Sequence, residues 1–321
     1  GANGETVTAD YGGASATCTA ASNAYTCTFT SSVLAASNSG GGVSDGIIAV
    51  TVDVSDAAGN AATQSSTSVT QDTSDPTLSS ISIASDNSDT SLAKSGDTLT
   101  LTITASESVT SLACTIDGEA ATMGGSGTSW TAALQASGDE TAGAATFSCA
   151  SHVDAAANAG AADTTADSGS ITIDFVVPTL GTVGIADAGT GNANDGDDVT
   201  LTFTSSETIQ TPTCTMKDGA GATMDNSVAT TNTNGNVWTC VVDTHDNDAD
   251  GAMTFSIAYT DSAANAGTAD TTVDDGSSVT IDNTHPTLGT VGIAVEGTGN
   301  ANDGDDVTLT FTATETIQTP T

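Results

Sequence analysis

Carboxylates at recurring positions are the residues of this chain whose types and spacing could do chemistry. The segments "DAAGNAA" (56–62), "DAAANAG" (154–160) and "DSAANAG" (261–267) each place an Asp four residues before an Asn. Asp and Asn suit tight turns, because both tolerate left-handed backbone and hydrogen-bond to nearby backbone groups. Their oxygens are also ligands for Ca²⁺, which takes about six to eight oxygens in a flexible geometry. Turn chemistry and half of a metal site are therefore two competing interpretations.

The motif recurs because the chain is a repeat. The stretch "PTLGTVGIADAGTGNANDGDDVTLTFTSSETIQTPT" (178–213) returns almost unchanged at 286–321, and a diverged copy starts at Pro76. A Pro opens each copy, and a Glu closes its conserved strand, at Glu107, Glu207 and Glu315. Self-similarity at a fixed period is the signature of a repeat architecture.

Period-two hydrophobicity predicts the elements that position these residues. Val199, Leu201 and Phe203 alternate with Thr, as do the equivalent residues of the other copies. Alternation of this kind is typical of half-buried antiparallel strands, and Gly, Asn and Asp clusters separate them. In the third repeat we expect strands near 180–186, 198–205, 212–217, 223–230, 237–242, 253–260 and 278–282. The fold class predicted is all-β, as tandem immunoglobulin-like β-sandwiches of about 100 residues.

The repeat boundaries predict four domains. These are a partial domain at 1–72 with the later strands C to G, complete domains at 73–175 and 176–283, and a partial domain at 284–321 with strands A and B. Two explanations of the partial domains stay open. The chain is a fragment of a longer array, or the last half-domain of one molecule completes the first half-domain of the next. The second explanation gives a head-to-tail polymer of copies of this chain.

The sandwich topology gathers carboxylates at one pole of each domain, where the incoming linker meets two loops. The predicted calcium ligands of the second domain are Asp72 or Asp75, Glu107, Asp154 and Asn158. Those of the third are Asp174, Glu207, Asp261 and Asn265. The fourth has only Asp282 and Glu315, which Asp56 and Asn60 of a neighbouring molecule would complete. Clustered carboxylates repel one another unless a cation lies between them.

A weaker metal candidate is the loop "HDNDADG" (245–251), with Asp246, Asp248 and Asp250. It resembles the first half of an EF-hand loop, but Ile257 stands where the bidentate Glu is required. An ordinary acidic turn is the alternative. His245 could join such a site or be a solvent-exposed loop residue, whereas His152 and His285 fit a strand end and a linker.

Composition narrows the function classes. The chain has 321 residues, with 40 acidic residues against two lysines, and a net charge of −38. Nucleic acids and anionic membranes require Lys and Arg, so neither is an expected partner. No run of apolar residues is long enough for a transmembrane helix. No phosphate-binding loop or catalytic triad is recognisable, and we expect no enzymatic activity and no catalytic residue.

Six cysteines fall as one pair in each of three repeats, which predicts disulfides and an oxidising, extracellular setting. We expect Cys18–Cys27 to staple a hairpin between strands D and E, Cys114–Cys149 to join strands C and F, and Cys214–Cys240 to bridge the two sheets. Free or intermolecular thiols are the alternative.

One extra residue in "ATFSCASHVDAAANAG", compared with "MTFSIAYTDSAANAG", predicts a β-bulge.

The repeat openers "DTSDPTL", "DFVVPTL" and "DNTHPTL", the strand "GDDVTLTFTSSE" and the Asp-x-x-x-Asn loop together resemble the tandem bacterial Ig-like repeats of giant surface adhesins. The resemblance covers nearly the whole chain, although the cysteine pairs depart from the usual pattern of those repeats. It implies a structural, often calcium-stiffened stalk at a cell surface.

Two other functions stay open beside the stalk. One is a calcium-dependent module that binds a carbohydrate or another surface ligand, and the other is a spacer of a secreted enzyme. Trp130 and Trp238 would serve as a sugar-stacking platform in the binding module, whereas their phase in the strand predicts core packing.

Overall fold

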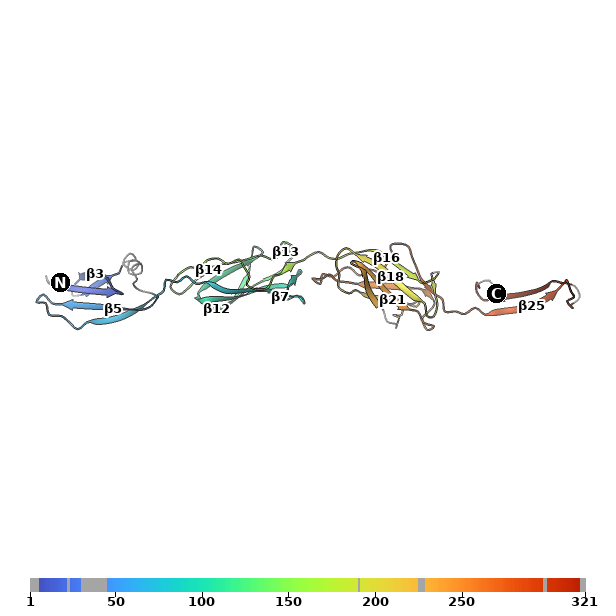
Figure 1. Cartoon of the computed structure of the whole chain (residues 1–321), viewed down its shortest axis with the longest axis horizontal. Helices are drawn as coiled ribbons and strands as arrows, with labels where there is room; N and C mark the ends of the chain where they lie inside the picture. The colour runs from blue at the N-terminus through green and yellow to red at the C-terminus, as the bar shows by residue number, and fades with distance from the viewer. Residues whose placement is uncertain are drawn as a thin grey trace. The chain divides into compact units, whose positions relative to one another are not determined.

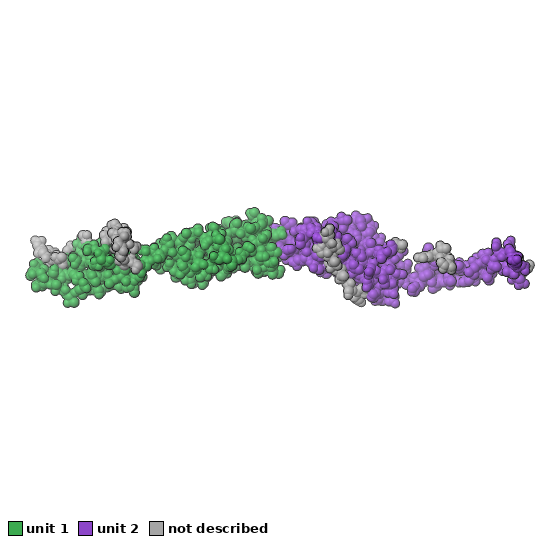
Figure 2. All heavy atoms as spheres, in the orientation of Figure 1, with its two compact units in different colours: residues 1–174 green, residues 175–321 purple. Residues whose placement is uncertain are grey.

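The computed structural model describes residues 6–21, 24–29, 45–189, 191–224, 229–296 and 299–317. The elements in this part of the chain are all strands (Figure 1). Accordingly, it contains no helix long and apolar enough to cross a membrane. The chain divides into two compact units, Gly1–Asp174 and Phe175–Thr321 (Figure 2). Each unit is described by itself below.

Unit 1 begins with a four-stranded antiparallel sheet and a separate hairpin, together called the first sheet here. The sheet has the order β2-β1-β5-β6, and the hairpin is β3-β4. The strands are β1 (Thr6–Tyr11), β2 (Ala14–Ser15), β3 (Thr17–Ala21), β4 (Ala24–Thr28), β5 (Gly46–Ser55) and β6 (Ser65–Gln71). In the repeat these correspond to strands C to G.

The rest of unit 1 is a complete β-sandwich, called sandwich 1. One sheet has the order β12-β9-β7, and the facing strands form β11-β10-β14 and β13-β15-β8. The strands are β7 (Leu78–Ser85), β8 (Leu92–Ala93), β9 (Thr98–Val109), β10 (Ser111–Ile116), β11 (Glu119–Ala120), β12 (Thr122–Gln135), β13 (Gly143–Ala144), β14 (Phe147–Val153) and β15 (Thr172–Ile173).

Unit 2 repeats this plan in sandwich 2. One sheet has the order β16-β18-β21-β20, and β19-β23 and β17-β24-β22 face it. The strands are β16 (Leu180–Asp187), β17 (Asn192–Ala193), β18 (Asp198–Ser205), β19 (Thr213–Lys217), β20 (Ala229–Asn234), β21 (Val237–Asp243), β22 (Gly251–Ala252), β23 (Thr254–Ala258) and β24 (Thr280–Ile281). The parallel pairing of β17 with β24 closes the second sheet. This strand order is that of an immunoglobulin-like sandwich, which confirms the predicted fold class.

The alternating residues form the core of both sandwiches. Val199, Leu201 and Phe203 are fully buried in β18, and Thr residues lie between them on the other face. Trp238 is also buried, in β21 beside Phe203, whereas Trp130 is half-buried and donates its indole N–H to Gly127. Core packing is therefore confirmed for Trp238, which cannot present its ring to a sugar.

Six of the seven strands predicted in the third repeat lie within two residues of their expected bounds. The exception is strand D, expected near 223–230, because β20 starts at Ala229 and residues 225–228 lie outside the described part. The predicted bulge is confirmed. The pairing of β10 with β14 shifts register where Ser151 takes a left-handed φ of 59°.

Unit 2 continues into a hairpin of β25 (Leu288–Val295) and β26 (Val307–Ala313). Their apolar residues alternate as predicted, but most of them are exposed, and of the larger ones only Val295 and Phe311 are half-buried. The reason is that β25 and β26 form a two-stranded sheet, and no other sheet among the described residues covers it.

The three disulfides pair as predicted. Cys18 and Cys27 face each other across the β3-β4 hairpin, and Cys114 and Cys149 across β10 and β14. Cys214 in β19 is bonded to Cys240 in β21, which joins the two sheets of sandwich 2. With aromatic residues at only 3% of the chain, these crosslinks supplement thin cores.

Removal of the Cys114–Cys149 disulfide by a double Ala replacement should destabilise sandwich 1. The bond closes a loop of 35 residues, so loop-closure entropy gives an expected loss of about 3.8 kcal/mol. Calorimetric unfolding of the full chain measures it. The matched control, C18A/C27A, removes a disulfide of the first sheet and should leave the transition of sandwich 1 unchanged. Equal shifts of that transition in both variants would contradict the assignment.

Candidate metal centre

The Asp-x-x-x-Asn turn has the same geometry in all three copies. In the first, Asp56 Oδ1 accepts the Asn60 backbone N–H at 2.8 Å and Asp56 Oδ2 accepts the Asn60 amide at 2.8 Å. In the second, the equivalent Asp154–Asn158 distances are 2.9 and 2.7 Å, and in the third, the Asp261–Asn265 distances are both 2.8 Å. The predicted turn chemistry is thus present in every copy.

Left-handed backbone completes each turn. Gly59, Ala157 and Ala264 occupy the equivalent position, with φ of 87°, 72° and 67°. Alanine is strained in this region, whereas glycine is not. In the two complete sandwiches, contacts with the surrounding residues must therefore stabilise the turn. One source of that support is burial, since Asp154 and Asp261 are almost inaccessible, at 3% and 1% exposure. Asp56, in the first sheet, is exposed.

In unit 1 the turn lies beside two further carboxylates. Asp72, Glu107 and Asp154 each offer an oxygen within 4.8 Å of the others. Asp72 directly follows β6, the last strand of the first sheet, and Glu107 lies near the end of β9 in sandwich 1. Three carboxylates from a linker, a strand and a loop therefore converge at the pole where the linker enters the sandwich. Asp75, the alternative linker residue, is exposed and is not a member of the cluster.

The asparagine of the turn positions this cluster. The Asn158 amide donates to Asp154 Oδ2 and also to the backbone oxygen of Asp72, at 3.1 Å. Asn158 was predicted as a metal ligand together with Asn60 and Asn265. In each copy the amide nitrogen donates to the Asp and fixes the direction of that carboxylate, and the amide oxygen as a metal ligand stays a prediction.

The electrostatics of the cluster are those of like charges held together. Burial raises the pKa of Glu107 above its ordinary value, and repulsion from Asp72, Asp154 and Asp45 raises it further. Burial also acts to raise the pKa of Asp154, but hydrogen bonds from Asn158 and from backbone N–H groups outweigh it, so that pKa is lowered. Asp154 thus stays ionised, and the repulsion among the carboxylates appears as the raised pKa of Glu107. A cation between them would relieve this repulsion.

In unit 2 the equivalent loop residues also meet. Glu207 and Asp261 offer carboxylate oxygens within 4.8 Å of each other. Asp174, the linker residue of this set, is the last residue of unit 1, where its backbone N–H donates to Ala93. The residue types Asp, Glu and Asp recur at the same repeat positions as in the Asp72 cluster.

Asp282 and Glu315, the remaining predicted pair, both line a cavity of about 660 Å³ in unit 2. Asp195, Asp197 and Asp246 line it as well, so five carboxylates face this cavity. The Asp-x-x-x-Asn turn that accompanies the equivalent residues elsewhere has no counterpart after Glu315 in the described residues. Asp282 and Glu315 are thus the carboxylates of this set among the described residues.

The carboxylates of the "HDNDADG" loop accept hydrogen bonds within their own turn and from the linker. Asp248 accepts the backbone N–H of His245 at 2.7 Å. Asp250 accepts the backbone N–H of Asn283 at 2.7 Å and the hydroxyl of Thr284 at 2.5 Å. Asp246 donates its backbone N–H to Asp195, so the loop faces the 192–198 turn, as expected. These contacts favour the acidic-turn interpretation over a metal site.

Sequence reasoning missed a carboxylate that holds the linker after the first repeat and the linker after the third. Asp45 accepts the backbone N–H and hydroxyl of Thr73, both at 2.8 Å, and the hydroxyl of Ser74 at 2.5 Å. Asp250 makes the equivalent contacts in unit 2, as described above. The signal for both was the Asp-Gly pair before strand F, at 45–46 and 250–251. Ala142 stands there in the second repeat.

The histidines lie outside the cluster. His245 is exposed, and its hydrogen bond to the Thr244 carbonyl and the nearby Asp248 and Asp195 raise its pKa. His285 is an exposed linker residue, and His152 lies at the end of β14, as expected. His152 is fully buried against Gly160, which the sequence did not indicate.

No family model matches this chain, and no curated protein matches it either. Among solved structures, the ICAM-5 D1–D4 ectodomain fragment is 14% identical, with a TM-score of 0.32, over 84% of this chain and 75% of that one. The I9–I11 tandem of titin is 10% identical, with a TM-score of 0.28, over 86% and 87%. The titin domains Z1Z2 in complex with telethonin are 11% identical, with a TM-score of 0.25, over 67% and 98%. At these scores the fold assignment rests on the strand order.

Glu107→Gln tests the repulsion in the Asp72 cluster. In chelator near pH 7, we expect the variant to unfold at a higher temperature than the parent, because it holds two charges together instead of three. A raised pKa means that the folded parent gains stability as the pH falls and Glu107 protonates, so the difference should shrink near pH 4.5. Glu119→Gln, on an exposed residue of β11, is the matched control. The same shift in both variants at both pH values would refute the account.

Proposed function

We propose that this chain is a segment of an extracellular stalk or filament at a cell surface, in which Ca²⁺ fixes each Ig-like sandwich to the linker that precedes it. The observation that carries the proposal is the convergence of Asp72, Glu107 and Asp154 within 4.8 Å. One carboxylate comes from the linker and two come from the sandwich, so a shared cation would couple the two.

The donor set fits Ca²⁺ well. It is a hard cation that prefers oxygen, and carboxylates can bind it through one or both oxygens. No cysteine or histidine belongs to the cluster, which argues against zinc. The chain offers only two lysines, Lys94 and Lys217, to neutralise 40 acidic residues, and Lys94 is paired with Asp97. A divalent cation would supply positive charge to the cluster.

The linker is already held from both sides without a cation. Asp45 of the first sheet accepts hydrogen bonds from Thr73 and Ser74, and Asn158 of sandwich 1 donates to the Asp72 carbonyl. A cation at Asp72 would add an ionic crosslink between these two sets of contacts. Repeats that couple only to their neighbours in this way form long one-dimensional objects, which suits a stalk.

Disulfides support an extracellular location, since they persist where the environment is oxidising. Modules outside the cell also meet millimolar calcium, and extracellular calcium modules bind it with dissociation constants of about 0.1 to 1 mM. A structural role needs no tighter binding, because the cation would be permanently present.

Asp72→Asn tests the proposal, with Asp75→Asn as the matched control. Both remove one linker carboxylate, but only Asp72 belongs to the cluster. Calcium titration calorimetry of the full chain should show that D72N weakens one class of sites at least about tenfold, whereas D75N does not. Hydrogen exchange of the amides at residues 72–75 should slow with calcium in the parent and in D75N only. Equal binding and equal exchange in the two variants would exclude the Asp72 cluster as a calcium site.

A further inference from the structure

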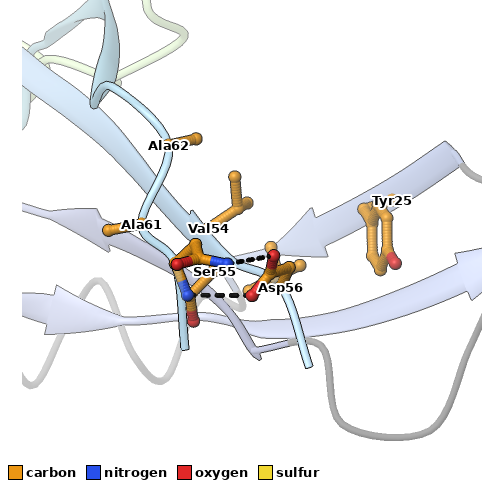
Figure 3. Close-up of a pocket in the computed structure, with 8 residues that line it drawn as sticks. Tyr25, Val54, Ser55, Asp56, Ala61 and Ala62 are labelled. Carbon is orange, nitrogen blue, oxygen red and sulfur yellow. Dashed lines mark hydrogen bonds between the residues drawn. The ribbon is translucent and has the colours of Figure 1, made fainter. Parts of the chain in front are cut away.

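Strand F of the first repeat, β5, has an Asp at each end. Asp56 follows β5 and accepts the hydrogen bonds of the Asp-x-x-x-Asn turn, which Figure 3 shows as dashed lines. Asp45 precedes β5 and accepts hydrogen bonds from Thr73 and Ser74 of the outgoing linker. We call this second contact the linker clamp, because it ties a repeat to the linker that leaves it.

The third repeat has the same clamp. Asp250 accepts the backbone N–H of Asn283 at 2.7 Å and the hydroxyl of Thr284 at 2.5 Å. In both repeats, hydrogen bonds from the linker hydroxyls, followed by those from its backbone N–H groups, lower the pKa of the clamp Asp. The acceptor is therefore charged near neutral pH, and hydrogen bonds to a charged acceptor are stronger than those between neutral groups. These two linkers are held to the repeats that precede them.

The second repeat keeps the backbone of the clamp without its side chain. Gly46, Gly143 and Gly251 begin strand F in the three repeats, with left-handed φ of 137°, 123° and 136°. Glycine adopts such a conformation without strain, so the same turn forms in every repeat. The residue before each glycine therefore extends from an equivalent backbone, and in the second repeat that residue is Ala142.

The pairing register brings Ala142 to the linker. Gly143 pairs with Ile173, which lies two residues before Phe175, in the register that Gly251 and Ile281 show in the third repeat. A methyl group cannot accept a hydrogen bond. The linker that leaves sandwich 1 thus meets the clamp position and finds no carboxylate there.

The linker itself has changed in the same sense. Phe175 and Val176 occupy the positions at which the other linkers have Thr or Asn, followed by Ser or Thr. Neither side chain carries a hydrogen-bonding group. Burial does not replace the clamp at the next two positions, since Val176 and Val177 are 59% and 51% exposed.

We propose that the linker 174–177 is the hinge of this chain, about which its two compact units change direction. The division into compact units falls in this linker, between Asp174 and Phe175, whereas the linkers 72–75 and 282–285 each lie within one unit. Hinges of this kind are a few loop residues that absorb changes in φ and ψ. The role of the hinge as a joint in a stalk rests on the proposed function. The missing clamp does not, because a clamp contains no cation.

Amide hydrogen exchange of the full chain, resolved by NMR, tests whether this clamp is missing. The Phe175 amide should be protected at least about tenfold less than the Thr73 and Asn283 amides, because those two donate to a charged acceptor. Ala142→Asp should raise the protection of the Phe175 amide by a similar factor. Ala144→Asp adds the same charge at an exposed position of β13 and should leave that amide unchanged. The difference between Phe175 and Thr73 should persist in chelator, so failure of the calcium proposal would leave it in place.

Residual dipolar couplings measure the hinge motion. In the parent, sandwich 1 and sandwich 2 should require alignment tensors of different magnitude, because segments that move independently align to different degrees. Ala142→Asp with Phe175→Thr and Val176→Ser copies the first clamp into this linker, and the two tensors should become more alike. A parent that fits one common tensor would overturn the proposal, as would a Phe175 amide as protected as that of Thr73. A clamp variant that changes neither the exchange nor the tensors would overturn it as well.

Discussion

The structure depends on how a chain with 40 acidic residues and two lysines stabilises its negative charges. Most of the carboxylates described above do so locally, because their oxygens accept backbone N–H groups and hydroxyls in tight turns. Asp56, Asp89, Asp218 and Asp250 all have a lowered pKa from such hydrogen bonds. These turns hold the ends of the strands, so the same residues that make the chain acidic also define its loops.

At the poles of the sandwiches, hydrogen bonds within a turn do not separate the carboxylates from one another. At the Asp72 cluster a linker carboxylate, Glu107 and the buried Asp154 share one small volume, and the pKa of Glu107 rises as a result. The Asp-x-x-x-Asn turn keeps Asp154 charged in spite of its burial. A fold that only avoided repulsion would have separated these groups, and their convergence at a domain junction is what suggests a structural cation.

The second constraint is apolar. Each sandwich needs strands A and B on one sheet to cover strands C and F on the other, and aromatic residues are scarce. In sandwich 2 most apolar residues of strands A and B are buried, whereas most of the same residue types in β25 and β26 are exposed. The disulfides also stabilise the sandwiches, since they crosslink strands of domains whose cores are small.

Much of this architecture could be predicted from the sequence, because period-two alternation and long internal repeats report directly on strands and on their register. The disulfide pairs followed from the strand assignments, and the bulge at Ser151 followed from one extra residue. The linker contacts of Asp45 and Asp250 and the burial of His152 could not be predicted, because they depend on which side chains meet across a junction. The choice of Asp72 over Asp75, and the donor role of Asn158, required the backbone path of the linker.

The most direct test of the central claim is a crystal structure of the chain grown in millimolar calcium. The account predicts an ion bonded to oxygens of Asp72, Glu107 and Asp154 at about 2.3 to 2.6 Å, with an anomalous signal that identifies calcium. A cluster that holds only water at saturating calcium, with Glu107 turned away from Asp72 and Asp154, would contradict it.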